Sequence, residues 1–168
     1  MKKVVVIGGA GYIGTVLTDL LLKKKNNVIC IDIFKFGKKP IEKFIKNKKF
    51  KYFKINTSNT NKIIKISSNA HSVVDLSGIV GDPACDVNKK NTYNSNYYNT
   101  LKICNALNGK NINRFIYVSS CSVYGSSEGE KLITEKSKVK PISLYAELKI
   151  KCEKYILLNK FDYSTTVL

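Results

Sequence analysis

The feature that most constrains the fold of this chain is a glycine-rich loop directly after its first hydrophobic run. Lys3 to Ile7 form a short apolar run that predicts a buried strand, and Gly8, Gly11 and Gly14 follow at the spacing G-x-x-G-x-x-G. Glycine permits a tight turn and removes the Cβ that would block a pyrophosphate, while a helix start offers free N–H groups to phosphates. A glycine loop between a strand and a helix therefore predicts a dinucleotide site.

The rest of the chain alternates between strand and helix signals. Apolar runs predict further strands at Asn27–Ile33, Phe50–Ile55, Ser72–Leu76, Arg114–Ser119 and Tyr163–Leu168. Helical spacing or end signals predict helices at Gly11–Lys24, Pro40–Lys46, Asn61–Ser67, Thr92–Leu107 and Ser143–Asn159. Such alternation is typical of parallel βαβ units, so the predicted fold class is α/β: a Rossmann-type doubly wound parallel sheet in three α/β/α layers.

Ligands of such sheets bind at the carboxyl ends of the strands. Asp32 ends the second predicted strand, 18 residues after Gly14. A carboxylate there can accept hydrogen bonds from the adenosine ribose and would repel a 2′-phosphate, which favours NAD over NADP. NADP stays open as the alternative cofactor, because the nearby Lys35, Lys38 and Lys39 can neutralise such a phosphate.

The fourth predicted strand ends in small residues that let the backbone approach a cofactor. These are Leu76, Ser77 and Gly78, although they also suit the plain start of a loop. Asn96, on the helix that follows, is a candidate to brace the strands beneath the nicotinamide.

The last predicted helix carries the candidate catalytic pair. Tyr145 and Lys149 are four residues apart and share one helix face. An ammonium about 5 Å from the phenol oxygen would lower the tyrosine pKa by about 2 units and make it a general base. Ser120 and Ser122, after the fifth strand, supply hydroxyls that can reach the same substrate oxygen. We expect His71, the only histidine, to be structural, which argues against a serine-hydrolase triad.

The composition suggests nucleic-acid binding or metal binding, but the distribution of the residues argues against both. The formal charge is +17, yet all but one of the 29 basic residues are lysines scattered along the chain, which favours a solvated basic surface over a nucleic-acid patch. The five cysteines form no C-x-x-C pair, so we expect reduced thiols and no metal. No apolar run is long enough to span a membrane, and without targeting signals we expect a cytoplasmic protein.

Together these motifs resemble those of extended short-chain dehydrogenases/reductases. The resemblance rests on Gly8 to Gly14, on Asp32, on the stretch Ser119 to Gly125, and on Tyr145 to Lys149. Their order and spacing are similar to those of NAD-dependent nucleotide-sugar epimerases and dehydratases of the UDP-glucose 4-epimerase type.

The resemblance implies a role for each matching residue. The family's catalytic serine or threonine falls on Ser120, 25 residues before Tyr145, and the catalytic set is Ser120, Tyr145 and Lys149. The substrate contacts are Ser120, Ser122 and Tyr145. The NAD contacts are Gly8, Gly11, Tyr12, Ile13, Gly14, Asp32, Ile33, Asn56, Leu76, Ser77, Gly78, Asn96, Tyr145 and Lys149.

The resemblance also implies partners and a missing part. The substrate is a nucleotide sugar, and relatives pair two helices as a homodimer; here Leu101, Cys104, Leu148 and Ile156 are the expected contacts. Relatives continue into a C-terminal substrate domain, so we expect residues 1–168 to be the NAD-binding domain of a fragment.

Several positions depart from the family pattern. Asn56 replaces the usual aspartate, and Cys121 and Ser122 stand where 4,6-dehydratases carry an Asp-Glu pair, which disfavours dehydration. Epimerization is therefore the leading hypothesis. An NAD-dependent sugar-nucleotide reductase and a non-catalytic NAD- or polyanion-binding module remain as alternatives.

Overall fold

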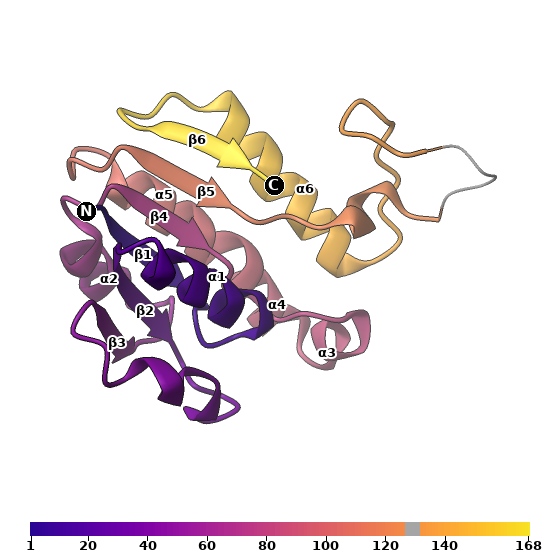
Figure 1. The fold of residues 1–168 in the computed structure, drawn as a ribbon. Helices are drawn as coiled ribbons and strands as arrows, with labels where there is room; N and C mark the ends of the chain where they lie inside the picture. The colour runs from indigo at the N-terminus through magenta and orange to yellow at the C-terminus, as the bar shows by residue number, and fades with distance from the viewer. Residues whose placement is uncertain (127–131) are drawn as a thin grey trace.

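The computed structural model, which describes residues 1–126 and 132–168, has one parallel sheet of six strands (Figure 1). The strands are β1 (Lys3–Ile7), β2 (Asn27–Asp32), β3 (Phe50–Lys54), β4 (Ser72–Asp75), β5 (Arg114–Tyr117) and β6 (Ser164–Val167). Their order is β3-β2-β1-β4-β5-β6, and every neighbouring pair is parallel. This is the strand order of the Rossmann fold and confirms the predicted class.

The central strands are apolar on both faces because both faces are covered. In β1, Val5 and Ile7 belong to one buried cluster, whereas Val4 and Val6 belong to another. Residues of a strand alternate between faces, so a strand that is covered on both sides reads as a continuous apolar run.

The first cluster packs under three helices, α2 (Thr60–Ser67), α5 (Asn99–Leu107) and α6 (Leu144–Leu158). The second packs under α1 (Tyr12–Lys23) and the 3-10 helix η1 (Lys39–Phe44), as Figure 1 shows for α1 in front of the sheet. None of the described helices is long and apolar enough to cross a membrane.

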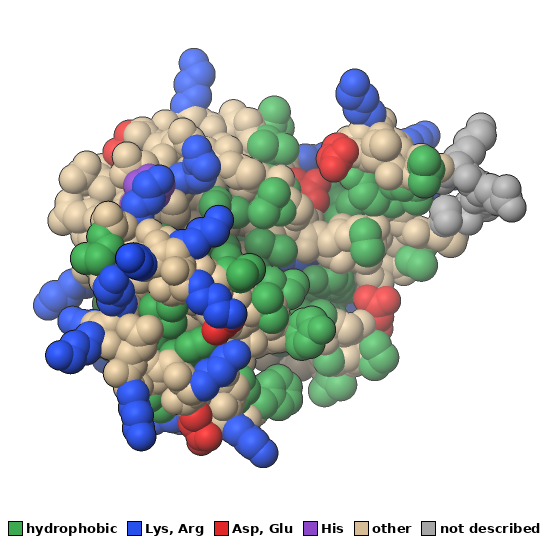
Figure 2. All heavy atoms as spheres, in the orientation of Figure 1, with side chains coloured by type: hydrophobic (Ala, Val, Ile, Leu, Met, Phe, Trp, Pro, Cys, Tyr) green, Lys and Arg blue, Asp and Glu red, His purple; other side chains and the backbone are tan. Residues whose placement is uncertain are grey.

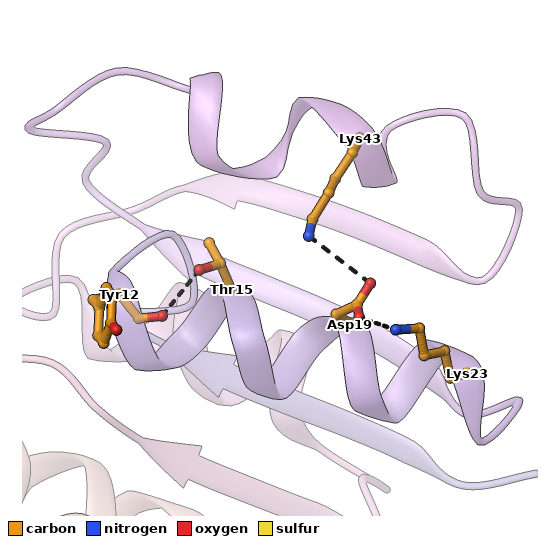
Figure 3. A network of polar contacts seen from close by, with 5 residues as sticks. All are labelled: Tyr12, Thr15, Asp19, Lys23 and Lys43. Atoms are coloured by element: carbon orange, nitrogen blue, oxygen red, sulfur yellow. Dashed lines mark hydrogen bonds and ion pairs between the residues drawn. The ribbon is translucent and has the colours of Figure 1, made fainter.

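Two polar contacts at the surface of α1 lie within the helix, and a third reaches η1 (Figure 3). The Thr15 hydroxyl donates to the Tyr12 carbonyl at 2.9 Å, inside the first turn. Asp19 forms an ion pair with Lys23 at 2.6 Å on α1 itself and with Lys43 of η1 at 3.9 Å. Such exposed pairs contribute little to stability, so the buried apolar side of α1 is what holds it against the sheet.

The face drawn in Figure 2 shows how charge and hydrophobic groups are distributed. Lysine and arginine side chains lie mainly on the left half and upper edge of this face, while hydrophobic side chains gather near its middle. The exposed hydrophobic residues of α1 are Tyr12, Ile13, Val16 and Leu20.

The predicted helix over residues 92–107 is more complex in the structure. It consists of α4 (Lys89–Tyr93), a π-helical turn η2 (Asn94–Tyr98) and α5. The hydrophobic pattern did not predict α3 (Asp82–Val87), a short helix that begins with Asp82-Pro83 and packs against α6. A π turn adds a residue to the helical repeat and often marks a functional site.

The expected dimer contacts are wrong for three of the four residues. Cys104, Leu148 and Ile156 are each fully buried within this single chain. Leu101 also packs against the first cluster, although it is only partly buried. The helical spacing of these residues is real, but their apolar face covers the chain's own core.

Candidate active site

The glycine loop lies at the carboxyl end of β1 and packs directly on backbone. Gly8 has φ +76°, and a Cβ there would lie 2.9 Å from the carbonyl carbon of Leu76, the residue directly after β4. At Gly14, a Cβ would lie 2.6 Å from the Gly9 Cα. The glycines therefore let the loop contact both the next strand and the first turn of α1.

The start of α1 is open to an anion. Its N-cap is Gly11, which has no side chain to accept from the first N–H groups, and its first turn carries no acidic residue. These N–H groups and the positive end of the helix dipole suit a phosphate. Tyr12 and Ile13 lie at this end with 91% and 56% of their surface exposed. The arrangement fits a pyrophosphate laid across the loop.

Asp32 joins the glycine loop to the end of β2. Its Oδ2 accepts from the Ala10 N–H at 3.0 Å, and its Oδ1 accepts from the Phe34 N–H at 2.7 Å. A carboxylate has about four lone-pair positions, so each oxygen keeps capacity for a ribose hydroxyl. Ile33 follows it and is exposed, and the exposed Asn56 lies just beyond the end of β3.

Asn96 holds the loop that follows β4. Its Oδ1 accepts from the Ile79 N–H at 2.7 Å and its Nδ2 donates to the Ile79 carbonyl at 2.8 Å. A Cβ at Gly78, which has φ +148°, would lie 3.1 Å from the same Asn96 oxygen. Asn96 therefore fixes the loop of Leu76, Ser77 and Gly78 through Ile79, and its role beneath a nicotinamide stays a prediction.

The three predicted catalytic residues meet at the carboxyl end of β5. Ser120 caps the 3-10 helix η3 (Cys121–Tyr124), accepting from the Ser122 N–H at 3.2 Å and the Ser122 hydroxyl at 2.9 Å. Ser143 caps α6 by accepting from the Ala146 N–H, which sets Tyr145 in the first turn. Lys149 follows one turn later, with its Nζ 5.6 Å from the Tyr145 ring centre.

The electrostatics of Tyr145 differ from the expectation. Burial raises the pKa of the Tyr145 phenol above its ordinary value, and a hydrogen bond with Ser120 opposes that rise. Cys85, Asp82 and Cys121 add to it. Lys149 is not among the largest influences on this pKa; its ammonium donates to the Val118 carbonyl at 2.7 Å and lies over the Tyr117 ring.

Two features of the site were missed in the sequence. Asp75, the last residue of β4, is a fully buried carboxylate. Its signal was an aspartate inside a Val-Val-Asp-Leu run that otherwise reads as buried strand. The second is α3, whose Asp82 and Cys85 lie near enough to Tyr145 to affect its pKa.

Other predictions about chemistry concern residues away from this edge. His71 precedes β4 at the opposite, amino end of the sheet, where its Nδ1 lies 2.9 Å from the Ser72 hydroxyl. Across residues 1–126 and 132–168, no group of three His, Cys, Asp or Glu side chains is placed to hold a metal.

Comparison with known proteins gives a consistent result. Residues 4–167 match the family described as the NAD dependent epimerase/dehydratase family. The chain is 29% identical to a Bacillus subtilis protein named "Uncharacterized UDP-glucose epimerase YtcB", over 98% of this chain and 54% of that protein. It is 30% identical to a UDP-glucose 4-epimerase of Lactobacillus helveticus, over 90% of this chain and 45% of that protein.

Solved structures agree with these relatives. A UDP-N-acetylglucosamine 4-epimerase from Methanobrevibacter ruminantium, in complex with UDP-N-acetylmuramic acid, superposes with a TM-score of 0.87 at 27% identity, covering 99% of this chain and 53% of that one. This chain thus spans about half the length of the relatives it matches. With the family match over nearly all its residues, the chain belongs to the NAD dependent epimerase/dehydratase family.

Proposed function

We propose that this chain binds NAD and forms the cofactor-binding half of an epimerase that acts on a nucleotide sugar. The observation that carries the proposal is a convergence at one sheet edge. The open start of α1, the Asp32 carboxylate and the trio Ser120, Tyr145 and Lys149 all lie at the carboxyl ends of the strands. The relatives named as UDP-sugar 4-epimerases support the substrate class.

The cofactor contacts follow the order of the strands. The free N–H groups after Gly11 hold the pyrophosphate, and Asp32 accepts from the adenosine ribose hydroxyls. The loop of Leu76, Ser77 and Gly78, fixed by Asn96, lies alongside the rest of the dinucleotide. Lys149 holds the nicotinamide ribose with its ammonium.

When bound, NAD supplies a hydride acceptor and donor. Proton transfer is carried out by the chain's own residues. The Tyr145 oxygen takes the proton of a sugar hydroxyl, and the Ser120 hydroxyl holds the same substrate oxygen. Since burial raises the Tyr145 pKa, the free chain keeps its phenol protonated. The positive charge of a bound nicotinamide would favour the phenolate and prepare it as a base.

A second candidate is NAD binding without turnover. The chain spans about half the length of the relatives it matches. Epimerization needs contacts to the sugar and its nucleotide as well as a bound cofactor. A sugar-nucleotide reductase differs from both candidates because it would leave its product with a net oxidation or reduction. An epimerase instead returns the hydride to the same sugar.

Calorimetry with NAD and NADP tests the cofactor. We expect tighter NAD binding because the Asp32 carboxylate opposes a 2′-phosphate. Asp32→Asn, which keeps the shape but removes the charge, should narrow the difference. Equal or tighter binding of NADP by the unaltered chain would contradict the assignment.

Tyr145→Phe tests the proton step in a form of the protein that turns over a UDP-sugar. The substitution removes only the phenol oxygen, so NAD binding should persist while turnover falls by about 100- to 10,000-fold. Ser120→Ala should reduce turnover less, since the Ser122 hydroxyl lies 2.9 Å from the Ser120 oxygen. Near-full activity of Tyr145→Phe would remove Tyr145 from the mechanism.

A further inference from the structure

Asp75 is an unusual residue for the centre of a parallel sheet. It ends β4 between Ile7 of β1 and Tyr117 of β5, and none of its surface is exposed. Burying a carboxylate is costly unless it is hydrogen-bonded and its charge is balanced. An apolar residue would suit this place better, so the charge needs an explanation.

Neutral groups supply part of the hydrogen bonds that the Asp75 carboxylate can accept. Its Oδ1 accepts from the Ser77 N–H at 2.9 Å and from the Ser77 hydroxyl at 2.6 Å. Among the described residues, its Oδ2 accepts only from the Thr100 hydroxyl, at a long 3.4 Å. These contacts orient the carboxylate, but they carry no positive charge.

Lys149 supplies the nearby positive charge. Its side chain is buried, with 6% of the residue exposed, and its Nζ lies 4.5 Å from the centre of the Tyr117 ring. Tyr117 is the residue that pairs with Asp75 across the β4–β5 ladder. The two charged groups are not in direct contact, since the ion pairs within 4.0 Å among the described residues involve neither of them.

The charges of the two groups affect each other. Burial lowers the pKa of Lys149, and Asp75 is the largest influence that raises it again. Burial raises the pKa of Asp75, with Ser77, Lys149 and Thr100 opposing. The other titratable groups around the pair are Cys104 of α5, Tyr117 of β5, and Tyr145, Cys152 and Glu153 of α6.

We propose that the Asp75 carboxylate is the counter-charge that keeps the buried Lys149 side chain an ammonium, and that Asp75 thereby acts on cofactor binding through Lys149. Asp75 is a positioning residue in this scheme: it touches Ser77 and Thr100, and its charge acts on Lys149 from beneath the site. The part that concerns the cofactor rests on the proposed NAD site. The pairing of charges does not.

The first test is the ionisation of Lys149 in the chain without cofactor. Isotope-labelled lysine allows its ε-carbon signal to be followed by NMR against pH, identified by its absence in Lys149→Met. Asp75→Asn keeps a similar shape but removes the charge, and should lower the Lys149 midpoint by about 1 to 3 pH units. Glu153→Gln, the same change of charge on the partly buried Glu153, should lower it less. An unchanged midpoint in Asp75→Asn would overturn the proposal.

Stability provides a test that holds even if Asp75→Asn folds poorly. Removing one member of a buried pair leaves the other charge uncompensated, whereas removing both does not. The double variant Asp75→Asn/Lys149→Met should therefore melt above the temperature expected from adding the two single effects. Simple additivity would show that the two charges are not coupled and would refute the pairing.

NAD affinity tests the remaining part. Calorimetry between pH 7 and 10 should show that the NAD affinity of Asp75→Asn falls at a lower pH than that of the unaltered chain. Above both Lys149 midpoints, the affinity of Asp75→Asn should be lower by about tenfold for each pH unit that separates these midpoints. Parallel affinity curves would refute the action on the cofactor. If the unaltered chain bound no NAD, the proposed function and this part would both fail, while the NMR midpoint would still decide the pairing.

Discussion

Substitution of Gly14 by alanine is the sharpest test of how the glycine loop is built. A Cβ at this position would lie 2.6 Å from the Gly9 Cα, about 0.8 Å short of the 3.4 Å at which ordinary contact begins. It would also lie 2.7 Å from the Gly8 carbonyl oxygen. Both neighbours are backbone atoms, so no side chain can rotate away. The start of α1 or the loop itself must move.

The size of the effect follows from two opposing contributions. Forcing an extra methyl group into a packed site costs about 1–3 kcal/mol. Alanine favours the helix over glycine by up to about 1 kcal/mol, which offsets part of that cost. The net loss of stability should be about 1–2 kcal/mol. For a chain of this size, the melting temperature should fall by about 2–8 °C.

Thermal unfolding and NAD calorimetry measure the two consequences. Gly11→Ala is the matched control, because Gly11 has φ −75° and the nearest atom to its Cβ is the Gly8 oxygen at 3.3 Å. It should melt within about 2 °C of the unaltered chain. Gly14→Ala should also weaken NAD binding, since a displaced helix start misplaces its N–H groups. If Gly14→Ala melted like Gly11→Ala, the close packing of loop and helix would be wrong.

Three further predictions follow from the same structure. Asn96→Ala should lower the free energy of unfolding by about 1–3 kcal/mol in denaturant titration, because it removes the acceptor of the Ile79 N–H and one of the two donors to the Ile79 carbonyl, which keeps only the Cys85 thiol at 3.3 Å; no loss would contradict the brace. The Tyr145 phenol should ionise above pH 10.0 in the free chain, since its pKa is raised, and at a lower pH with NAD bound. The ultraviolet difference between the unaltered chain and Tyr145→Phe measures this ionisation. Ionisation below pH 10.0 without NAD would refute the effect of burial. A homodimer through α5 and α6 must use their exposed residues. Lys102→Glu, at an exposed position, should therefore weaken association measured by light scattering, whereas Cys104→Ser, at a buried position, should change stability alone. A monomer at high concentration would exclude the dimer.

The sequence alone predicted the fold and most residues at the site's edge. Apolar runs such as Lys3–Ile7 predicted the strands, and the glycines predicted the turn, because both signals are local. All five later strands end one or two residues earlier in the structure than at their predicted C-terminal limits, for example β4 at Asp75 instead of Leu76. Apolar residues continue past the last ladder position into the loops that line the site, so hydrophobicity alone places these ends too late.

Tertiary structure decided what each side chain faces. Leu148 and Ile150 are both buried on α6 because that helix packs against α5, α3 and η3 as well as β6, so helical spacing could not assign one outer face. Lys149 lies near Tyr145, as the four-residue spacing predicted, yet its ammonium bonds to Val118. Burial lowers its pKa, and the largest opposing influence is Asp75, 74 residues earlier in the chain. Local spacing determines which residues share a helix face. Burial and the charges brought there by distant strands determine their pKa, and those exist only once the sheet has formed.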